Sequence, residues 1–371
     1  MKCDVIVTYC WNRVGYNILR SLTRQGLSVV VGDTSNKNIC SLSKYVSGNF
    51  VYPDPFTNED EFISWIIAKV QELSPKVLLP THDESIIIAK HRDCFPLDLI
   101  IPIDHYDNLV SLSNKITATN LAQKANIPVP RIFKHISEIT KFPVVYKTAI
   151  GNSAKGVYFP KNIDDLNVIA AKNSDKETFI QEKVNGTDHS VDCIRYGHFF
   201  FALTYKALVT KTDGGGTTTQ RIIVDCPQLI EYSKLLLDYV DYNGVCGLDF
   251  KCDDMGRAYF IECNTRYTGG LATPITAGFD IPYIHYCIST KGKYDKEIEI
   301  KFGSKTKWIL GDIITFIGRL ISFKLKKAEI QQIFNFKFDA FDDYRKDDKK
   351  AIIGEMIYYF NKLVKNRKLN P

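Results

Sequence analysis

The 371-residue chain is long enough for two or three domains with separate cores, and a hydrophobic content of 45% is ordinary for a soluble globular protein. Its net charge of +6 is spread out without a basic stripe or tail, which argues against nucleic acid as a partner. The ten cysteines are scattered and form no CxxC pair, so the pattern favours reduced thiols over a disulfide framework or a zinc site. Because the first residues lead straight into a strand without a signal-peptide core, we expect a cytoplasmic protein.

The beginning of the chain is expected to form a parallel α/β sheet. Apolar and β-branched runs predict strands at 4–8 and 27–31, and helical periodicity fills 14–25 between them. The turn at 9–15 contains one glycine, so the GxGxxG fingerprint of dinucleotide binding is absent. An enzyme that uses a nicotinamide cofactor is therefore a disfavoured alternative.

A later strand at 76–80 leads into the polar loop Thr81-His-Asp-Glu84. Sites of α/β proteins lie beyond the carboxyl ends of strands, so this loop can face a ligand. It can equally cap the next helix with acids in the first turn, and both interpretations stay open.

Residues 142–147 predict a strand that ends at Lys147, and a small, polar, glycine-punctuated loop follows at 148–157. Backbone N–H groups of such a loop can cover phosphate oxygens, and Lys147 adds a point charge. No GKS or GKT follows, so this is not a Walker A sequence, and a plain hairpin connection is the alternative.

Two further strands surround polar residues that a nucleotide could use. The strand at 178–184 precedes Asp188. The edge backbone of this strand can pair with an adenine, and Asp188 can accept hydrogen bonds from ribose hydroxyls. The alternative is a hairpin whose acid faces water. After an apolar strand at 199–210, the polar residues 211–221 predict a flexible loop of the kind that closes over substrates.

The segment 245–270 predicts a β-hairpin with a turn at 253–256. Asp249 and Glu262 then lie on adjacent paired strands, with Asn264 on the same face as Glu262. Two carboxylates and an amide oxygen suit Mg²⁺, and the Arg266 guanidinium that follows could hold a phosphoryl group or an acyl phosphate. An exposed hairpin whose acids face water is the alternative reading.

The end of the chain is expected to be helical. The segment 307–325 is almost continuously apolar, but Asp312 and Arg319 interrupt it, and it does not exceed the ~20 residues of a spanning helix. We expect it to pack on the protein's own core or on a second copy in a homodimer, with a membrane-surface helix as the alternative. Residues 338–370 predict a charged amphipathic helix.

These motifs, taken together and in order, resemble the ATP-grasp superfamily and within it the carbamoyl-phosphate-synthase-like carboxylate–amine ligases. The matching segments are NKITATNLAQKANIPVP, FPVVYKTAIGNSAKGV, FIQEKVNGTDHSVD, GLDF and FIECNTRYTGG, of which the E-x-N-x-R ending is the most specific. The resemblance implies an N-terminal parallel α/β domain at 1–112 and an ATP-grasp domain of two α+β subdomains at 113–290, with its lid at about 140–190. A helical extension at 291–371 matches no catalytic part of the family.

The resemblance also implies a role for each matching residue. ATP would be held at its phosphates by two lysines and a glycine loop, at its adenine by a hinge, and at its ribose by an acid; these residues are Lys115, Lys147, Gly151, Ser153, Gly156, Glu182, Lys183, Val184 and Asp188. Two Mg²⁺ ions, with Mn²⁺ as an alternative, would be held by Asp249, Glu262 and Asn264. Arg266 would steady the acyl phosphate, with Lys147 and, as a weaker candidate, Arg221 in contact with the reacting groups.

The implied activity is a ligase that joins a small-molecule carboxylate to an amine. ATP would convert the carboxylate to an acyl phosphate, and attack by the amine would form an amide and release phosphate. A non-catalytic or regulatory ATP-binding protein of the same fold is the alternative. An amino acid joined to a sugar amine, a peptide bond and another small amide all stay open as products, in surface-polysaccharide or small-metabolite synthesis.

Overall fold

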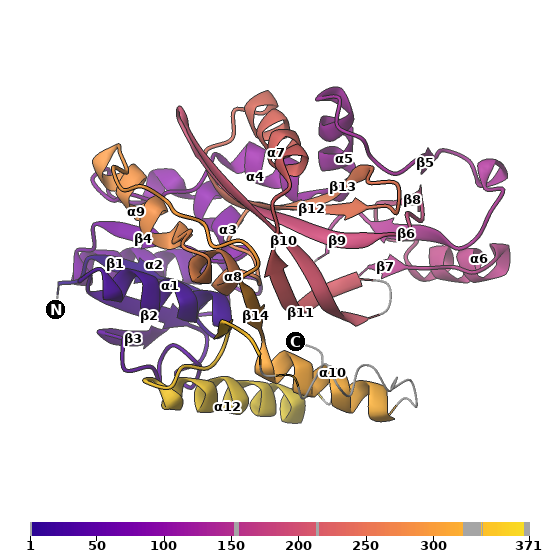
Figure 1. Cartoon of the computed structure of the whole chain (residues 1–371). Coiled ribbons are helices and arrows are strands. Elements are labelled where there is room, and N and C mark those ends of the chain that lie inside the picture. The colour runs from indigo at the N-terminus through magenta and orange to yellow at the C-terminus, as the bar shows by residue number, and fades with distance from the viewer. Residues whose placement is uncertain (1, 152–155, 213–214, 322–334, 336, 367–371) are drawn as a thin grey trace.

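The fold is built on three β-sheets, as a computed structural model shows (Figure 1). This structure describes every residue except 1, 152–155, 213–214, 322–334, 336 and 367–371. One sheet belongs to the N-terminal part, one to a small outlying unit, and the largest lies between them.

The N-terminal sheet is parallel, as the apolar runs predict. Its strand order is β3-β2-β1-β4, and β3 is a strand that the sequence analysis did not predict. Successive residues of its first strand face opposite sides, so Val5 and Val7 join one buried cluster while Ile6 joins another. Helix α1 covers the first side and α2 the second. The elements are β1 (Val5–Val7), α1 (Arg13–Arg24), β2 (Val29–Asp33), β3 (Gly48–Val51), α2 (Glu59–Leu73), β4 (Val77–Leu79), α3 (Glu84–Lys90) and a 3₁₀ turn, η1 (Arg92–Cys94).

A small antiparallel sheet, of order β5-β8-β6-β7, forms the outlying unit and follows two helices, α4 and α5. Asn114 caps α5, because its side-chain oxygen accepts hydrogen bonds from the backbone N–H groups of Ile116 and Thr117. The elements are α4 (Tyr106–Ser113), α5 (Lys115–Lys124), β5 (Ile132–Phe133), η2 (Ile136–Glu138), β6 (Val144–Thr148), β7 (Val157–Tyr158), α6 (Ile163–Lys172) and β8 (Thr178–Glu182).

The central sheet has seven strands in the order β13-β12-β9-β10-β11-β14-β15. The hairpin predicted at 245–270 is present in it as β12 and β13. The predicted flexible loop at 211–221 is wrong, because β11 begins at Gly215 and pairs with β10 and β14. Its run of threonines is β-branched and suits a strand between two partners. The elements are β9 (Thr187–Tyr196), β10 (Phe199–Thr212), β11 (Gly215–Ile223), α7 (Pro227–Tyr239), β12 (Gly244–Cys252), β13 (Ala258–Asn264), α8 (Ala272–Thr276) and α9 (Ile281–Lys291).

The last part of the chain is helical, as expected, but it also adds two strands to the central sheet. Strand β14 (Lys305–Lys307) pairs with β11, and β15 (Ala340–Phe341) pairs with β14. The helix predicted over 338–370 therefore begins only at Lys349, because the residues before it join the sheet and turn away from it. The helices are α10 (Ile309–Ile321) and α12 (Lys349–Asn366), which lie together along the lower edge of Figure 1. Among the residues whose positions are given, none of the helices has the length and apolarity to cross a membrane.

The buried carboxylate of Asp342 connects this tail to the N-terminal helix α1 and to the central sheet. Asp342 Oδ2 lies 2.7 Å from a terminal nitrogen of Arg221 on β11 and 3.4 Å from Nε of Arg13 on α1. All three side chains are at most 7% exposed. Asn17 of α1 adds a hydrogen bond of 2.9 Å to the backbone oxygen of Asp342.

Replacing Asp342 with Ala should destabilise the protein strongly, because two buried arginines lose their shared counter-charge. We expect the free energy of unfolding to fall by about 3–5 kcal/mol, measured by urea or thermal denaturation. Asp295→Ala is the matched control, since Asp295 is 68% exposed in its ion pair with Lys293 and should leave stability unchanged. Equal midpoints for the two variants would contradict this role of Asp342.

Candidate functional site

A cavity of about 1100 Å³ opens where the three parts of the chain meet. Its walls come from the β1–α1 turn, the small sheet, the central sheet and the C-terminal tail. Most residues singled out from the sequence line it: Lys147, Glu182, Lys183, Val184, Asp188, Arg221, Asp249, Glu262, Asn264 and Arg266.

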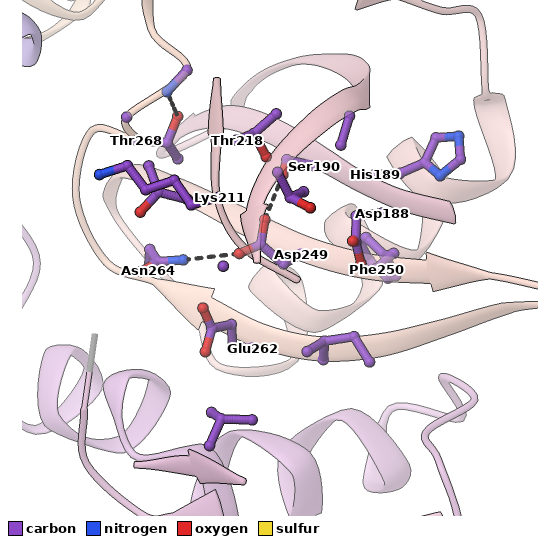
Figure 2. Close-up of a pocket in the computed structure, with 18 of the residues that line it drawn as sticks. Asp188, His189, Ser190, Lys211, Thr218, Asp249, Phe250, Glu262, Asn264 and Thr268 are labelled. Atoms are coloured by element: carbon purple, nitrogen blue, oxygen red, sulfur yellow. Dashed lines mark hydrogen bonds between the residues drawn. The ribbon is translucent and has the colours of Figure 1, made fainter. Parts of the chain in front are cut away.

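Two carboxylates and an amide come together on the hairpin β12–β13. Asp249 is paired directly opposite Glu262 in the strand register, with a bulge immediately after Asp249. Ser190 donates a hydrogen bond of 2.5 Å to Asp249 Oδ1, and Asn264 donates one of 3.3 Å to Oδ2 (Figure 2). Burial, together with the negative charge of Glu262, raises the pKa of Asp249 to about 8. The two carboxylates are thus held close together in a buried place.

Two buried lysines face this acidic pair from the small sheet and its preceding helix. Lys115 lies 3.4 Å from Glu262 Oε2 and is 5% exposed; it also donates to the backbone oxygen of Gly151. Lys147, equally buried on β6, has its pKa lowered to about 8 by burial, with Glu262 opposing the shift and Lys115 adding to it. Positive and negative groups therefore concentrate at one end of the cavity.

Arg266 contacts the polar loop after β4, which was open to two interpretations. Its Nε lies 2.8 Å from Asp83 Oδ1, and Asp83 and His82 line the cavity. Glu84 instead turns into the protein, where Thr8 and the backbone of Thr81 donate to its carboxylate. His82 and Asp83 of this loop thus face the cavity, whereas Thr81 and Glu84 form a hydrogen bond at the N-terminus of α3.

The residues expected at a nucleotide's base and sugar line the cavity. Of these, Asp188 lies on the other side of Asp249 from Lys211 (Figure 2). The backbone of Lys183 and Val184, just beyond β8, has no hydrogen-bond partner among the residues described. Asp188 forms an ion pair with Lys251 across the β9–β12 ladder and is 35% exposed. These groups can accept a planar ring and hydroxyls.

The glycine-punctuated loop is described only at its ends. Gly156 has a φ of +78°, and a side chain there would also collide with Thr148, so glycine is required. Ser153 lies outside the described residues, and Gly151 and Gly156 flank that gap without lining the cavity.

Arg221 lies on a strand and not on a mobile loop, and Asp342 and the backbone oxygen of Thr218 occupy its guanidinium. The tail also supplies cavity residues that the sequence reasoning missed, among them Trp308, Tyr359 and Lys362. Other missed residues are Tyr9, Trp11, Arg13, Ser190, Lys211 and Thr268. Tyr9, Trp11 and Arg13 follow the carboxyl end of β1, so the rule for sites of α/β sheets could have found them. The other missed residues carry no local signal, because long-range packing brings them to the cavity.

Behind the carboxylate pair lies a further acid, Asp192 on β9. It is 2% exposed, and neither carboxylate oxygen has a hydrogen-bond partner among the residues described. Burial raises the pKa of Asp192 to about 7.

Comparison with known families and structures gives consistent matches. Residues 174–310 match the model of a family described as ATP-grasp in the biosynthetic pathway with Ter operon. No curated protein matches the chain significantly.

Solved structures with a similar fold cover most of this chain. Biotin carboxylase from Campylobacter jejuni, in a complex with a β,γ-ATP ligand, is 16% identical with a TM-score of 0.68, over 82% of this chain and 74% of that one. The ADP complex of N5-carboxyaminoimidazole ribonucleotide synthetase is 17% identical with a TM-score of 0.66, over 86% and 85%. L-amino acid ligase from Bacillus licheniformis is 14% identical with a TM-score of 0.64, over 81% and 78%.

Asp192 predicts a pH dependence of stability. Its folded-state pKa of about 7 lies above the ordinary value of 3.8, so its contribution to stability is full below the ordinary value and is lost as pH rises through about 7. Asp192→Asn should therefore flatten the fall in melting temperature between about pH 4 and pH 7, the span between the two pKa values. The exposed Asp175→Asn serves as control and should keep the wild-type profile. An unchanged slope for Asp192→Asn would refute the assignment.

Proposed function

We propose that this chain is a member of the ATP-grasp superfamily and acts as an ATP- and Mg²⁺-dependent ligase that activates a carboxylate and transfers it to an amine. This proposal rests on the convergence of Asp249, Glu262 and the buried Lys147 at one end of a single cavity. Lys115 lies 3.4 Å from Glu262, although it does not itself line the cavity. Paired carboxylates suit a metal–phosphate complex, and buried lysines suit its phosphate oxygens.

The acidic pair fits Mg²⁺ in its chemistry. Asp249, Glu262 and Asn264 offer hard oxygen atoms. Burial and, after it, the negative charge of Glu262 raise the pKa of Asp249, and a bound cation would offset that charge. We propose that these three residues hold the metal, two ions in all. Bound Mg²⁺ would supply neutralisation of the charge on the transferring phosphoryl group.

The remaining residues bind and position the reactants. Lys115 and Lys147 would hold the ATP phosphates, the backbone at Glu182–Val184 the adenine edge, and Asp188 the ribose. Arg266, already aligned by Asp83, would orient the substrate carboxylate. In the first step the substrate carboxylate oxygen attacks the γ-phosphorus of ATP, and ADP leaves. In the second step the amine attacks the acyl carbon of the acyl phosphate. Phosphate then leaves with its bonding electrons, and the amine proton is released.

The neighbours support the proposal at the level of chemistry. The titles of those structures name ADP or ATP complexes and an amino acid ligase. A related biotin carboxylase domain from Hydrogenobacter thermophilus is described with MgADP and bicarbonate, at 14% identity and a TM-score of 0.66. The acid and the amine used by this chain are a separate matter of specificity.

Two conservative variants test the phosphate end. Glu262→Gln and Lys147→Met should each reduce ATP turnover by at least about 100-fold, because each removes a charge that stabilises the phosphoryl transfer. Initial rates of Mg²⁺-dependent ADP release measure this, with the exposed Lys301→Ala as control. A folded Glu262→Gln protein with wild-type turnover would sink the proposal.

The reaction class is tested by trapping the activated acid. Wild-type protein with Mg-ATP, pooled carboxylates and hydroxylamine should release ADP and form a hydroxamate with one pool. ADP release without hydroxamate would contradict acyl-phosphate chemistry. ATP binding without ADP release from any pool would favour a regulatory ATP-binding protein.

A further inference from the structure

We propose that the tail-side end of the cavity is an anion subsite, formed by Arg13 and Lys211 around Trp308, which selects acids that carry a second anionic group. This inference rests on the proposed ligase function and names the class of its substrate. The second group would be a carboxylate or a phosphate, which present the same charged oxygens to a guanidinium.

Arg13 and Lys211 both lie against the ring of Trp308 at the cavity wall. Cζ of Arg13 lies 3.7 Å from the centroid of the Trp308 ring, and Nζ of Lys211 lies 4.4 Å from it. Trp308 is 1% exposed, so the ring serves as a buried support. All three residues line the cavity although they come from α1, β10 and the tail.

The cations keep donors that the protein itself does not use. Nε of Arg13 donates to Gly269 O at 3.0 Å, while its two terminal nitrogens have no hydrogen-bond partner among the residues described. The Lys211 ammonium likewise makes only the ring contact within the described part of the chain. The buried guanidinium of Arg13 and the half-buried ammonium of Lys211 line the cavity with unused donors, which suit a ligand's oxygens.

Positive charge exceeds negative charge at this end of the cavity. Asp342 is shared by Arg13 and Arg221. The other nearby acids are engaged or neutral: Asp343 accepts the first N–H groups of α10, and burial raises the pKa of Glu355 well above its ordinary value. Burial and the charge of Arg13 lower the pKa of Lys211 to about 7, as expected for a cation without enough counter-charge.

This end and the acidic pair face the same cavity. In Figure 2, Lys211 lies on one side of Asp249 and Asp188 on the other. Arg266 directly follows the acidic hairpin, and its backbone N–H bonds Asn264 O at 2.8 Å. One acid group at Arg266 would react while another is held at Arg13 and Lys211, so a substrate with two anionic groups fits both ends.

Gly269 makes the subsite testable without removing a charge. A Cβ at this position would lie 2.6 Å from a terminal nitrogen of Arg13. Gly269→Ala should therefore displace the guanidinium. Because the same guanidinium pairs with the buried Asp342, the melting temperature of this variant is measured beside its binding. Lys211→Met removes the second cation and Lys211→Arg retains it.

Binding is measured by calorimetry on the full chain with saturating Mg-ADP. The probes are succinate, glutarate and adipate, each against its monoamide, and the corresponding phosphono acids, which separate a carboxylate preference from a phosphate preference. We expect one diacid or phosphono acid to bind at least about tenfold tighter than its monoamide. Lys211→Met and Gly269→Ala should each weaken that binding about tenfold or more, while Lys211→Arg restores it and the Kd of ATP stays unchanged.

The outcomes separate the subsite from the ligase reaction. Equal affinity for every acid and its monoamide, or a preference that survives both Lys211→Met and Gly269→Ala, overturns the subsite. ADP release with hydroxamate from the monoamides as fast as from the diacids also overturns it while the ligase function stands. Lys211-dependent binding of a diacid without ADP release confirms the subsite and refutes the ligase.

Discussion

The arrangement of the whole molecule depends on one buried carboxylate. Asp342 pairs with Arg13 of the first helix and Arg221 of the central sheet, so three parts of the chain are held to a single charge. Ion pairs at this depth are stable only while every partner remains, because an uncompensated charge away from water is costly. The tail therefore stays in a fixed position against the N-terminal sheet, and the cavity between them keeps one shape.

Much of the metal end was readable from the sequence, because its signals are local. Alternating apolar residues and a polar turn predicted the β12–β13 hairpin, and the two strands bring Asp249 opposite Glu262. The hydrogen bond from Ser190 to Asp249 was not readable, since the two residues are 59 positions apart and meet only through the register of β9 with β12. The roles of these residues toward ATP and Mg²⁺ remain predictions.

The prediction of a loop at 211–221 was wrong because it rested on the polarity of the segment, whereas pairing with neighbouring strands decides its structure. The threonine-rich segment after β10 has the composition of a loop, yet it lies between two strands that satisfy its backbone. The tail shows the opposite case. The apolar composition of 307–325 predicts that this segment packs against something, but not which residues it contacts. In the structure Trp308 of this segment contacts Arg13, far away in the sequence. Sequence periodicity carries no record of such contacts.

The tail's contacts with α1 have a consequence for synthesis of the protein. Tyr16 bonds the carboxylate of Asp348, 332 positions later, and Ser43 bonds the same carboxylate from 305 positions earlier. A chain emerging from the ribosome can form its N-terminal sheet early, but these contacts must wait until Asp348 has been translated. The cavity is then completed last, so a nascent chain cannot bind its substrates as the finished protein does. Slow, long-range closure of this kind gives chaperones a defined surface to protect.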